Sequence, residues 1–229
     1  MAGEADIAFV ATLLADPTRA TILLALSDGR AFTASELARR ARVSPSTASE
    51  HLARLVDSSL LLVEKQGRNR FFRLADPSIV EIMEHLARLA PQVKIHTLGE
   101  AEKAKAVYKA RMCYNHMAGR LGVALTEALV EREVLRVIEE GYFVDDAGAK
   151  WLEEFGIASQ PLKKHGLLFV PWHIDWSERK HHIAGAFGAA FTRRLFDLNW
   201  IERRPASRAL SITPHGRTAL EQTFHVHIA

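Results

Sequence analysis

Two helix-start signals follow each other closely in the first quarter of this 229-residue chain. Thr33 is followed three residues later by Glu36, which is the pattern of a capping box. Ser44 is followed by Pro45, so a favourable N-cap residue stands before the position where a helix tolerates proline best. The first helix extends to about Arg40, so residues 41–43 before the second signal leave room only for a turn. The pattern therefore predicts two helices, 34–40 and 45–58, joined as a helix-turn-helix.

The second of these helices is predicted to be amphipathic. Its apolar face carries Ala48, Leu52, Leu55 and Val56. Its opposite face carries short polar and charged side chains, namely Ser46, Thr47, Glu50 and Arg54, with Ser49 and His51 on the flanks. Side chains of this kind, near the start of a helix, read base edges in the major groove of DNA. This face is the candidate for reading a DNA sequence, and the helix start at Ser44 is a candidate phosphate contact.

A β-hairpin is predicted after the helix-turn-helix. Residues 60–63 and 71–74 are apolar and strand-like, and residues 66–70 between them are rich in turn formers. The tip carries Arg68, Asn69 and Arg70, which would place cations near phosphates or a minor groove. Further helices are expected at 7–14, at 17–27 and after Pro77. This order of elements predicts a winged helix.

The charge of the chain is concentrated in this segment. The whole chain carries a formal net charge of +3, whereas residues 36–73 contain eight Lys and Arg residues against four acids. A local positive patch is typical of proteins that bind a polyanion such as DNA.

The segment resembles the ArsR/SmtB family of bacterial repressors. The resemblance covers about residues 7–90 and rests on Leu37-Ala38, on Val43-Ser44-Pro45-Ser46-Thr47-Ala48-Ser49-Glu50-His51-Leu52, on Leu60-Leu61-Leu62-Val63 and on Phe71-Phe72-Arg73-Leu74. It implies a cytoplasmic homodimer that pairs through its first and last helices, binds a double-stranded operator and releases it on sensing an effector. The sensing sites of the simplest members do not recur here: residues 36–40 contain no cysteine pair, and Glu81, Glu84 and His85 do not have the spacing of paired zinc ligands.

Residues 97–229 extend beyond the minimal family fold and contain an internal repeat. The segment 116–125 aligns with 182–191 at an offset of 66, and 145–153 aligns with 213–221 at an offset of 68. Near-equal offsets indicate a duplicated unit, at about 112–157 and 178–226. We therefore expect a mainly α protein with small β-hairpins (α+β). Its N-terminal domain, 1–96, would bind DNA and dimerise. Its C-terminal domain, 97–229, would consist of two repeated winged-helix-like units and sense an effector.

One cysteine, three histidines and one aspartate in the second domain are the candidates for effector binding. They are Cys113, His116, His173, Asp175 and His182. Cys113 and His116 are three residues apart, which on a helix would place them on one face. Such residues suit a soft or borderline metal ion, or a redox sensor if the Cys113 thiolate is stabilised. The alternative is structural: the histidines would hydrogen-bond within the domain while Gly119, Gly122, Gly185 and Gly188 let helices pack closely. Aromatic residues nearby (Tyr114, Phe169, Trp172, Trp176 and Phe187) would line an organic-ligand pocket or form the core.

The C-terminal region also resembles that of some larger ArsR-type regulators, in the segments Cys113-Tyr114-Asn115-His116-Met117-Ala118-Gly119 and Asp175-Trp176-Ser177-Glu178-Arg179. In those relatives a cysteine usually precedes the second segment, where this chain has His173. This departure argues against a two-thiol chemistry.

The leading hypothesis is a sequence-specific, DNA-binding repressor whose affinity is set by an effector. No cofactor is identified for the fold, and whether a metal binds is left open. Two alternatives remain: an enzyme with a regulatory winged helix, for which no phosphate-binding loop, dinucleotide fingerprint or nucleophile elbow is found, and a protein-interaction module. The acidic start lacks a signal-peptide pattern and no apolar run is long enough to span a membrane, so we expect a cytoplasmic protein without a membrane partner. One cysteine excludes an intramolecular disulfide.

Overall fold

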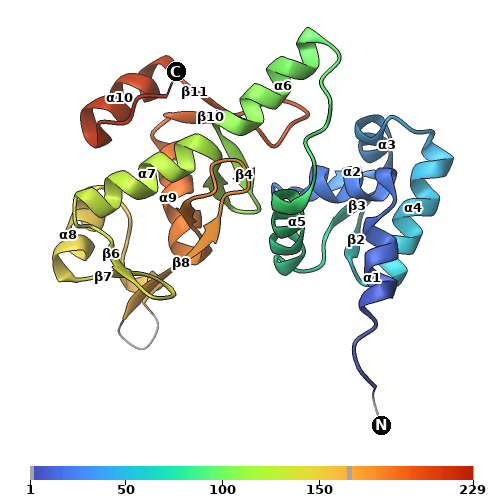
Figure 1. Cartoon of the computed structure of the whole chain (residues 1–229), viewed down its shortest axis with the longest axis horizontal. Helices are drawn as coiled ribbons and strands as arrows, with labels where there is room; N and C mark the ends of the chain where they lie inside the picture. The colour runs from blue at the N-terminus through green and yellow to red at the C-terminus, as the bar shows by residue number, and fades with distance from the viewer. Residues whose placement is uncertain (1–2, 164–166, 229) are drawn as a thin grey trace. The chain divides into compact units, whose positions relative to one another are not determined.

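The computed structural model describes residues 3–163 and 167–228. The chain divides into two compact units, residues 1–83 and 84–229 (Figure 1). The division falls within a helix, α5, which comprises Ser78–Leu89. Each unit has its own core.

The first unit is a winged helix-turn-helix. Its helices are α1 (Ile7–Leu14), α2 (Pro17–Leu26), α3 (Ala34–Ala41), α4 (Pro45–Asp57) and the first half of α5. Its strands are β1 (Phe32–Thr33), β2 (Leu61–Gln66) and β3 (Asn69–Leu74), which form one antiparallel sheet in the order β1-β3-β2. The helix-turn-helix, the hairpin and the fold class predicted from the sequence are confirmed for this unit.

Local signals define these elements. Thr33 and Glu36 form the expected capping box, in which the Thr33 N–H donates to the Glu36 carboxylate at 2.8 Å. Arg42 ends α3 with a left-handed backbone, φ 56°, which turns the chain toward α4. Arg19 is buried in α2, and its guanidinium donates to carbonyls of Thr12 and Leu13 at the end of α1. These contacts fix the helices around a core that includes Leu23, Leu37 and Leu55.

The second unit contains small antiparallel sheets and helices. Its helices are α6 (Leu98–Lys109), α7 (Gly119–Glu131), α8 (Asp146–Glu154), the short 3-10 helix η1 (Gln160–Leu162), α9 (Gly185–Asp197) and α10 (Pro214–Phe224). Its strands are β4 (Arg111–Cys113), β5 (His116–Ala118), β6 (Arg136–Ile138), β7 (Gly141–Val144), β8 (Leu168–Ile174), β9 (His181–Ile183), β10 (Ile201–Arg203) and β11 (Leu210–Ile212). The sheets are β4-β5, β6-β7-β8-β9 and β10-β11.

One order of elements occurs twice in the second unit. A strand, a helix, a hairpin and a helix follow each other in β5-α7-β6-β7-α8 and again in β9-α9-β10-β11-α10. Each strand packs against the helix of the other set: α9 contacts β5 and α7 contacts β9. The hydrogen bonds are reciprocal as well. Met117 N–H donates to the Thr192 hydroxyl at 2.9 Å, and Ile183 N–H donates to the Thr126 hydroxyl at 3.0 Å. The resemblance of either set to a winged helix stays a prediction.

Two glycines allow each of these helices to lie close to the strand that precedes it. A Cβ atom on Gly122 would lie 2.7 Å from the Met117 carbonyl oxygen, and one on Gly188 would lie 2.8 Å from that of Ile183. Side chains at these positions would push the strand and helix apart. The sequence predicted close packing between helices at these glycines, whereas Gly122 and Gly188 allow a helix to lie against a strand.

Among the described residues, no single helix is long and apolar enough to cross a membrane. The helices α1 and α2 reach that length and composition only as a pair, which is bent by 87°.

Candidate nucleic-acid interface and candidate metal centre

The position of α4 in the first unit is set by its buried face. Ala48, Leu52 and Leu55 are buried, and Ser44 caps the helix by accepting a hydrogen bond from the Thr47 N–H. The apolar pattern thus anchors one side of α4, and its other side is left to solvent.

The exposed side of α4 carries most of the residues predicted to contact DNA. Ser44, Ser46, Ser49 and Arg54 are exposed, and Thr47 is half-buried. The Ser44 hydroxyl lies 2.8 Å from that of Ser46 and 2.9 Å from that of Thr47. The Ser49 hydroxyl donates to the Pro45 carbonyl. The helix start therefore presents a cluster of short hydroxyl side chains.

His51 differs from these residues, because its ring lies toward α2. Its Nδ1 is 3.7 Å from an Asp16 carboxylate oxygen and 3.4 Å from a guanidinium nitrogen of Arg19, and its side chain is 17% exposed. The polar neighbours that hold the ring belong to the same unit.

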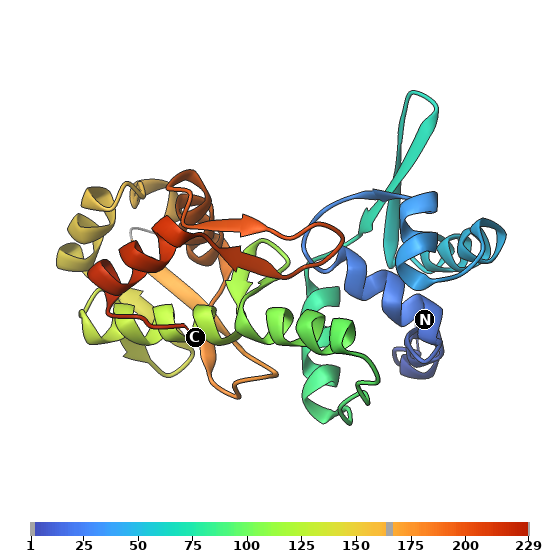
Figure 2. The same cartoon turned by 90° about the horizontal axis from the view of Figure 1, so that it is seen from above.

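The hairpin tip carries the predicted basic residues. The turn is tighter than the five residues expected, since β2 and β3 extend to the pair Gln66 and Asn69, and Gly67 has a positive φ of 59°. Arg68, Asn69 and Arg70 are exposed. Figure 2 shows the hairpin extending away from the helices of its unit.

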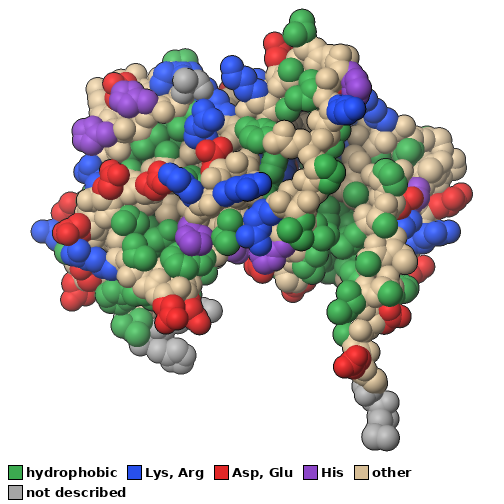
Figure 3. Space-filling view, viewed as in Figure 1, with side chains coloured by type: hydrophobic (Ala, Val, Ile, Leu, Met, Phe, Trp, Pro, Cys, Tyr) green, Lys and Arg blue, Asp and Glu red, His purple; other side chains and the backbone are tan. Residues whose placement is uncertain are grey.

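Apolar side chains are exposed on α1 and α5. They are Ile7 and Phe9 on α1 and Ile82, Leu86 and Leu89 on α5. Figure 3 shows hydrophobic side chains gathered along α1. Exposed apolar groups of this size mark association surfaces.

A second group of functional side chains meets in the second unit. Cys113, His116, His173 and His182 each offer one ligand atom, and all four atoms lie within 4.8 Å of one another. Cys113 comes from β4, His116 from β5, His173 from β8 and His182 from β9. Cys113, His116 and His182 are buried, and His173 is partly exposed. Four of the five predicted effector residues are thus brought together.

The route by which Cys113 and His116 meet differs from the prediction. They do not share a helix face: they are directly paired across the β4-β5 hairpin. The turn between them is made by Tyr114 and Asn115, and Tyr114 has a positive φ of 58°. Tyrosine rarely adopts this conformation, so the composition of the segment did not indicate a tight turn. The helix begins only at Gly119.

Several histidine nitrogens in this cluster have no hydrogen-bond partner among the described residues. They are Nε2 of His116 and both ring nitrogens of His182, and all are buried. The other nitrogen of His116 has a partner: Nδ1 lies 3.2 Å from Asn115 Oδ1. Since an amide oxygen only accepts, His116 Nδ1–H donates, and the lone pair of this neutral ring is then on Nε2.

Asp175 lies beside the cluster rather than in it. Its carboxylate accepts hydrogen bonds from Arg111 at 3.0 Å, from the Gly119 N–H at 2.6 Å and from Ser177. One oxygen is 3.8 Å from His182 Nδ1. Arg111 also contacts Glu84 at 3.4 Å, and Arg208 donates to Glu84 at 2.6 Å. The predicted effector residue Asp175 therefore joins a buried ion-pair network.

Burial dominates the protonation of this region. Desolvation, followed by the neighbouring histidines, holds the pKa of His116 well below its usual range. Burial likewise lowers the pKa of His182 to about 3, and the Asp175 charge offsets this only in part. Burial raises the pKa of the Cys113 thiol above its ordinary value. For Asp175, burial would raise the pKa, but Arg111 and the hydrogen bonds outweigh it, and the pKa is lowered. Without a cation, these pKa shifts favour the neutral forms of Cys113, His116 and His182.

Three of the aromatic residues considered for an organic-ligand pocket, Phe187, Trp172 and Trp176, have structural neighbours. Phe187 belongs to the buried core of the unit. Trp172 stacks on His181 with ring centroids 4.0 Å apart, and Trp176 makes an edge contact with Tyr108.

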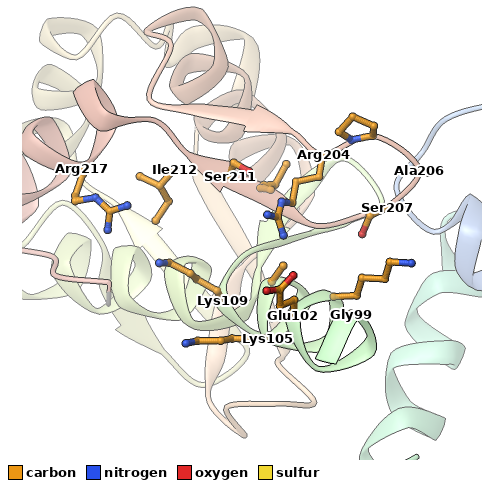
Figure 4. Close-up of a pocket in the computed structure, with 14 residues that line it drawn as sticks. Gly99, Glu102, Lys105, Lys109, Arg204, Ala206, Ser207, Ser211, Ile212 and Arg217 are labelled. Carbon is orange, nitrogen blue, oxygen red and sulfur yellow. The ribbon is translucent and has the colours of Figure 1, made fainter. Parts of the chain in front are cut away.

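A cleft does exist elsewhere in the second unit, and it is basic. It has a volume of about 800 Å³ and lies between α6, the β10-β11 hairpin and α10. Figure 4 shows Lys105, Lys109, Arg204 and Arg217 around it. Burial, followed by the nearby Arg217 and Lys105, lowers the pKa of Lys109. The sequence did not single out this cleft, because its cations come from segments about 100 residues apart.

Comparison with known proteins places these features in a family. A helix-turn-helix domain family model matches residues 14–64. Over 223 residues the chain is 41% identical to YdfF of Bacillus subtilis, described as an uncharacterized HTH-type transcriptional regulator, and the match covers 97% of this chain and 99% of the relative. A shorter match, 32% identical over 101 residues, covers 44% of this chain and 85% of the HTH-type transcriptional regulator CmtR of Mycobacterium tuberculosis.

The similar solved structures each cover less than half of this chain. Reduced HlyU from Vibrio cholerae is 29% identical, with a TM-score of 0.34, over 37% of this chain and 88% of its own. The cadmium metal-sensor CmtR from Mycobacterium tuberculosis is 31% identical, with a TM-score of 0.33, over 40% of this chain and 94% of its own. The match to YdfF covers nearly the whole of both proteins, and this chain has a winged helix-turn-helix. The chain therefore belongs to the HTH-type transcriptional regulators, of the ArsR type.

Proposed function

We propose that this regulator is a cytoplasmic repressor that binds a near-palindromic duplex operator as a homodimer, and that an effector bound by the second unit controls its affinity for DNA. The observation that carries the proposal is the exposed hydroxyl and cationic face of α4, held outward by its buried apolar face. The second unit would act by binding rather than by catalysis.

The α4 face suits the major groove. The groove is about 12 Å wide and admits one helix. Ser46, Thr47 and Ser49 lie in the first turns of α4, where short side chains reach base edges. Ser44 and the helix N-terminus favour a phosphate, and Arg54 extends the positive face further along the helix.

The hairpin tip supplies a second contact. Arg68 and Arg70 are exposed at a turn that extends away from the helices, and Asn69 lies between them. Cations at such a tip would contact phosphates or enter a minor groove beside the α4 site. We assign overall DNA affinity to the β2-β3 hairpin, which we call the wing, and discrimination between DNA sequences to α4.

Dimerisation follows from the exposed apolar residues of α1 and α5. Leu89 is 84% exposed and Ile7 is 77% exposed, and side chains of this kind gain free energy when a second copy covers them. A two-fold dimer presents two α4 helices, which explains the expected operator symmetry.

Binding to the chain's own promoter region, compared with a random duplex of equal length at physiological salt, tests this function. We expect a preference of at least about 10³-fold. The logarithm of the binding constant should fall linearly with the logarithm of salt concentration, by about 0.9 per phosphate neutralised. Equal affinity for the two duplexes would overturn the proposal.

A further inference from the structure

We propose that Cys113, His116, His173 and His182 form a tetrahedral site for a first-row transition-metal dication of the Zn²⁺ class, and that this cation is the effector. The effector role rests on the function proposed above, whereas the binding site itself does not. The distances, the unpartnered nitrogens and the identity of the donor atoms support the site independently of one another.

The donor atoms are close to the separations that a tetrahedral site requires. Bond lengths of about 2.0–2.3 Å imply donor atoms roughly 3.3–3.6 Å apart. Cys113 Sγ is 4.0 Å from His173 Nδ1, and no pair in the cluster exceeds 4.8 Å. Side-chain rotations that move the donor atoms by about 1 Å would therefore bring all four to bonding distance from an ion.

The buried histidine nitrogens call for a partner. A buried polar atom without a hydrogen bond costs roughly 1–3 kcal/mol, and His116 and His182 together contribute three such nitrogens among the described residues. Three imidazole rings crowd together here, with centroids 5.0–5.9 Å apart. A cation satisfies the lone pairs of neutral imidazoles, which these rings cannot do for one another without a proton between them.

The neighbours of the cluster orient its rings. Asn115 accepts from His116 Nδ1–H and so directs the Nε2 lone pair to the cluster. Asp175 lies 3.8 Å from His182 Nδ1, which is close to the ring but beyond hydrogen-bond distance. A carboxylate or carbonyl behind a ligand histidine is the usual second sphere of a metal site. Arg111 holds the Asp175 carboxylate in place.

The donor set selects the cation. One sulfur and three imidazole nitrogens suit Zn²⁺ and Co²⁺, whereas Mg²⁺ and Ca²⁺ require oxygen ligands. The carboxylate beside His182, that of Asp175, is already engaged by Arg111, Gly119 and Ser177. Four protein ligands also leave no open coordination position, which fits sensing rather than catalysis.

Binding would connect both halves of the second unit. Cys113 and His116 come from one hairpin, and His173 and His182 come from β8 and β9. The thiol proton of Cys113 passes to the buffer as the sulfur–metal bond forms, and each imidazole binds through the lone pair of its neutral form. The partly exposed His173 marks the side from which an ion arrives. The network through Asp175, Arg111 and Glu84 extends from the cluster to α5.

The test uses Co²⁺ and Zn²⁺ on full-length protein that has been freed of metal with a chelator. We expect one Co²⁺ per chain, with a thiolate-to-metal charge-transfer band and the intense visible bands of tetrahedral cobalt, and displacement of the cobalt by Zn²⁺. Native mass spectrometry gives the stoichiometry. Cys113→Ser should abolish the charge-transfer band. His173→Ala, at the partly exposed ligand, should weaken affinity by at least about tenfold. His215→Ala, at an exposed histidine of α10, should bind like the parent.

Two results separate this proposal from the function above. Operator affinity is measured for each protein with and without one equivalent of Zn²⁺, and we expect a change of at least about fivefold that is absent in His173→Ala. Failure to take up one cobalt per chain, or uptake that is unchanged in both ligand variants, would overturn the site. Uptake without any change in operator affinity would overturn the effector role. If the protein prefers the operator neither with nor without Zn²⁺, the proposed DNA-binding function is wrong. The cobalt spectra still test the metal site independently of that result.

Discussion

Arg111 and Asp175 form an ion pair that is fully removed from solvent, with Arg111 Nη2 3.0 Å from Asp175 Oδ2. The pair spans the second unit, since Arg111 is on β4 and Asp175 directly follows β8. Both residues make further contacts: Arg111 lies over the Trp176 ring at 4.7 Å, and Asp175 accepts from the backbone of Gly119.

Asp175→Asn is therefore predicted to destabilise the protein strongly. The change preserves the shape of the side chain but leaves the Arg111 charge buried with a weaker partner, and breaking such a pair costs about 3 kcal/mol of unfolding free energy. Urea unfolding followed by circular dichroism measures the loss. Glu131→Gln, at an exposed acid of α7, is the control and should stay within about 0.5 kcal/mol of the parent. Equal midpoints for Asp175→Asn and the parent would contradict the prediction.

Gly188→Ala is predicted to disturb both packing and the Cys-His cluster. The added Cβ would lie 2.8 Å from the Ile183 carbonyl oxygen and 3.0 Å from the Cβ of His116, so α9 must move away from β5. We expect a loss of about 1–3 kcal/mol and weaker cobalt binding. Gly99→Ala is the matched control, because a Cβ there meets nothing within 4 Å. The idea fails if the two variants have the same stability and the same cobalt affinity.

The wing is predicted to contribute affinity that depends on salt. Arg68→Ala should lower operator and random-duplex affinity alike and reduce the salt slope by about 1, as expected for one phosphate contact. Fluorescence anisotropy over a range of salt concentrations gives the slope. Lys150→Ala, at an exposed cation of α8 in the second unit, should leave the slope unchanged. A slope equal to that of the parent in Arg68→Ala would exclude a phosphate contact by this residue.

The α4 face is predicted to contribute discrimination instead. Ser49→Ala removes an exposed hydroxyl that bonds only within its own helix turn, so the fold should be unaffected. The preference for the operator over a duplex with one altered base pair should fall by about 1–3 kcal/mol at a single position. Thr218→Ala on α10 serves as the control. Unchanged discrimination at every position of the half-site would remove Ser49 from the readout.

The capping box of α3 is predicted to make the first unit sensitive to acid. Thr33→Ala should cost about 1 kcal/mol. The backbone N–H and the hydroxyl of Thr33 donate to the Glu36 carboxylate and lower its pKa. The folded pKa lies below the ordinary value of about 4.3, so this contribution is present above that pH and is lost as the pH falls through the folded pKa.

Thermal unfolding at pH 7 and near pH 3 checks this prediction. Glu36→Gln should lose part of its stability at pH 7 and differ less from the parent at the acid pH. A difference that grows on acidification would have the wrong sign and would argue against the cap as its cause.

The first unit could be predicted from sequence because its signals are local. Thr33, Glu36, Ser44 and Pro45 act within one helical turn of themselves, and they mark the same helix starts in the structure. The position of the His51 ring was not predictable in this way. Its ring is placed by Asp16 and Arg19, more than 30 residues away in the chain.

The residues of the candidate site in the second unit could be predicted from sequence, but their arrangement in space could not. Histidine and cysteine are recognisable by type, yet their convergence depends on strand pairing: Cys113 with His116, and His173 with His182. A helix was expected through Cys113 and His116 because nothing in the segment marks the positive φ of Tyr114. The sequence grouped Asp175 with the ligands because it is near them in the chain. In the structure its carboxylate instead accepts a hydrogen bond from Arg111, 64 residues away.

The reciprocal bonds of Met117 to Thr192 and of Ile183 to Thr126 mean that neither half of the second unit is complete alone. Each half provides a hydroxyl that accepts a hydrogen bond from a strand N–H of the other half. A protein truncated between the halves would therefore lose this acceptor, the apolar packing of the other half and two of the four donor atoms of the cluster. The two sets of elements therefore depend on each other, and the cysteine-histidine cluster can exist only where both are present.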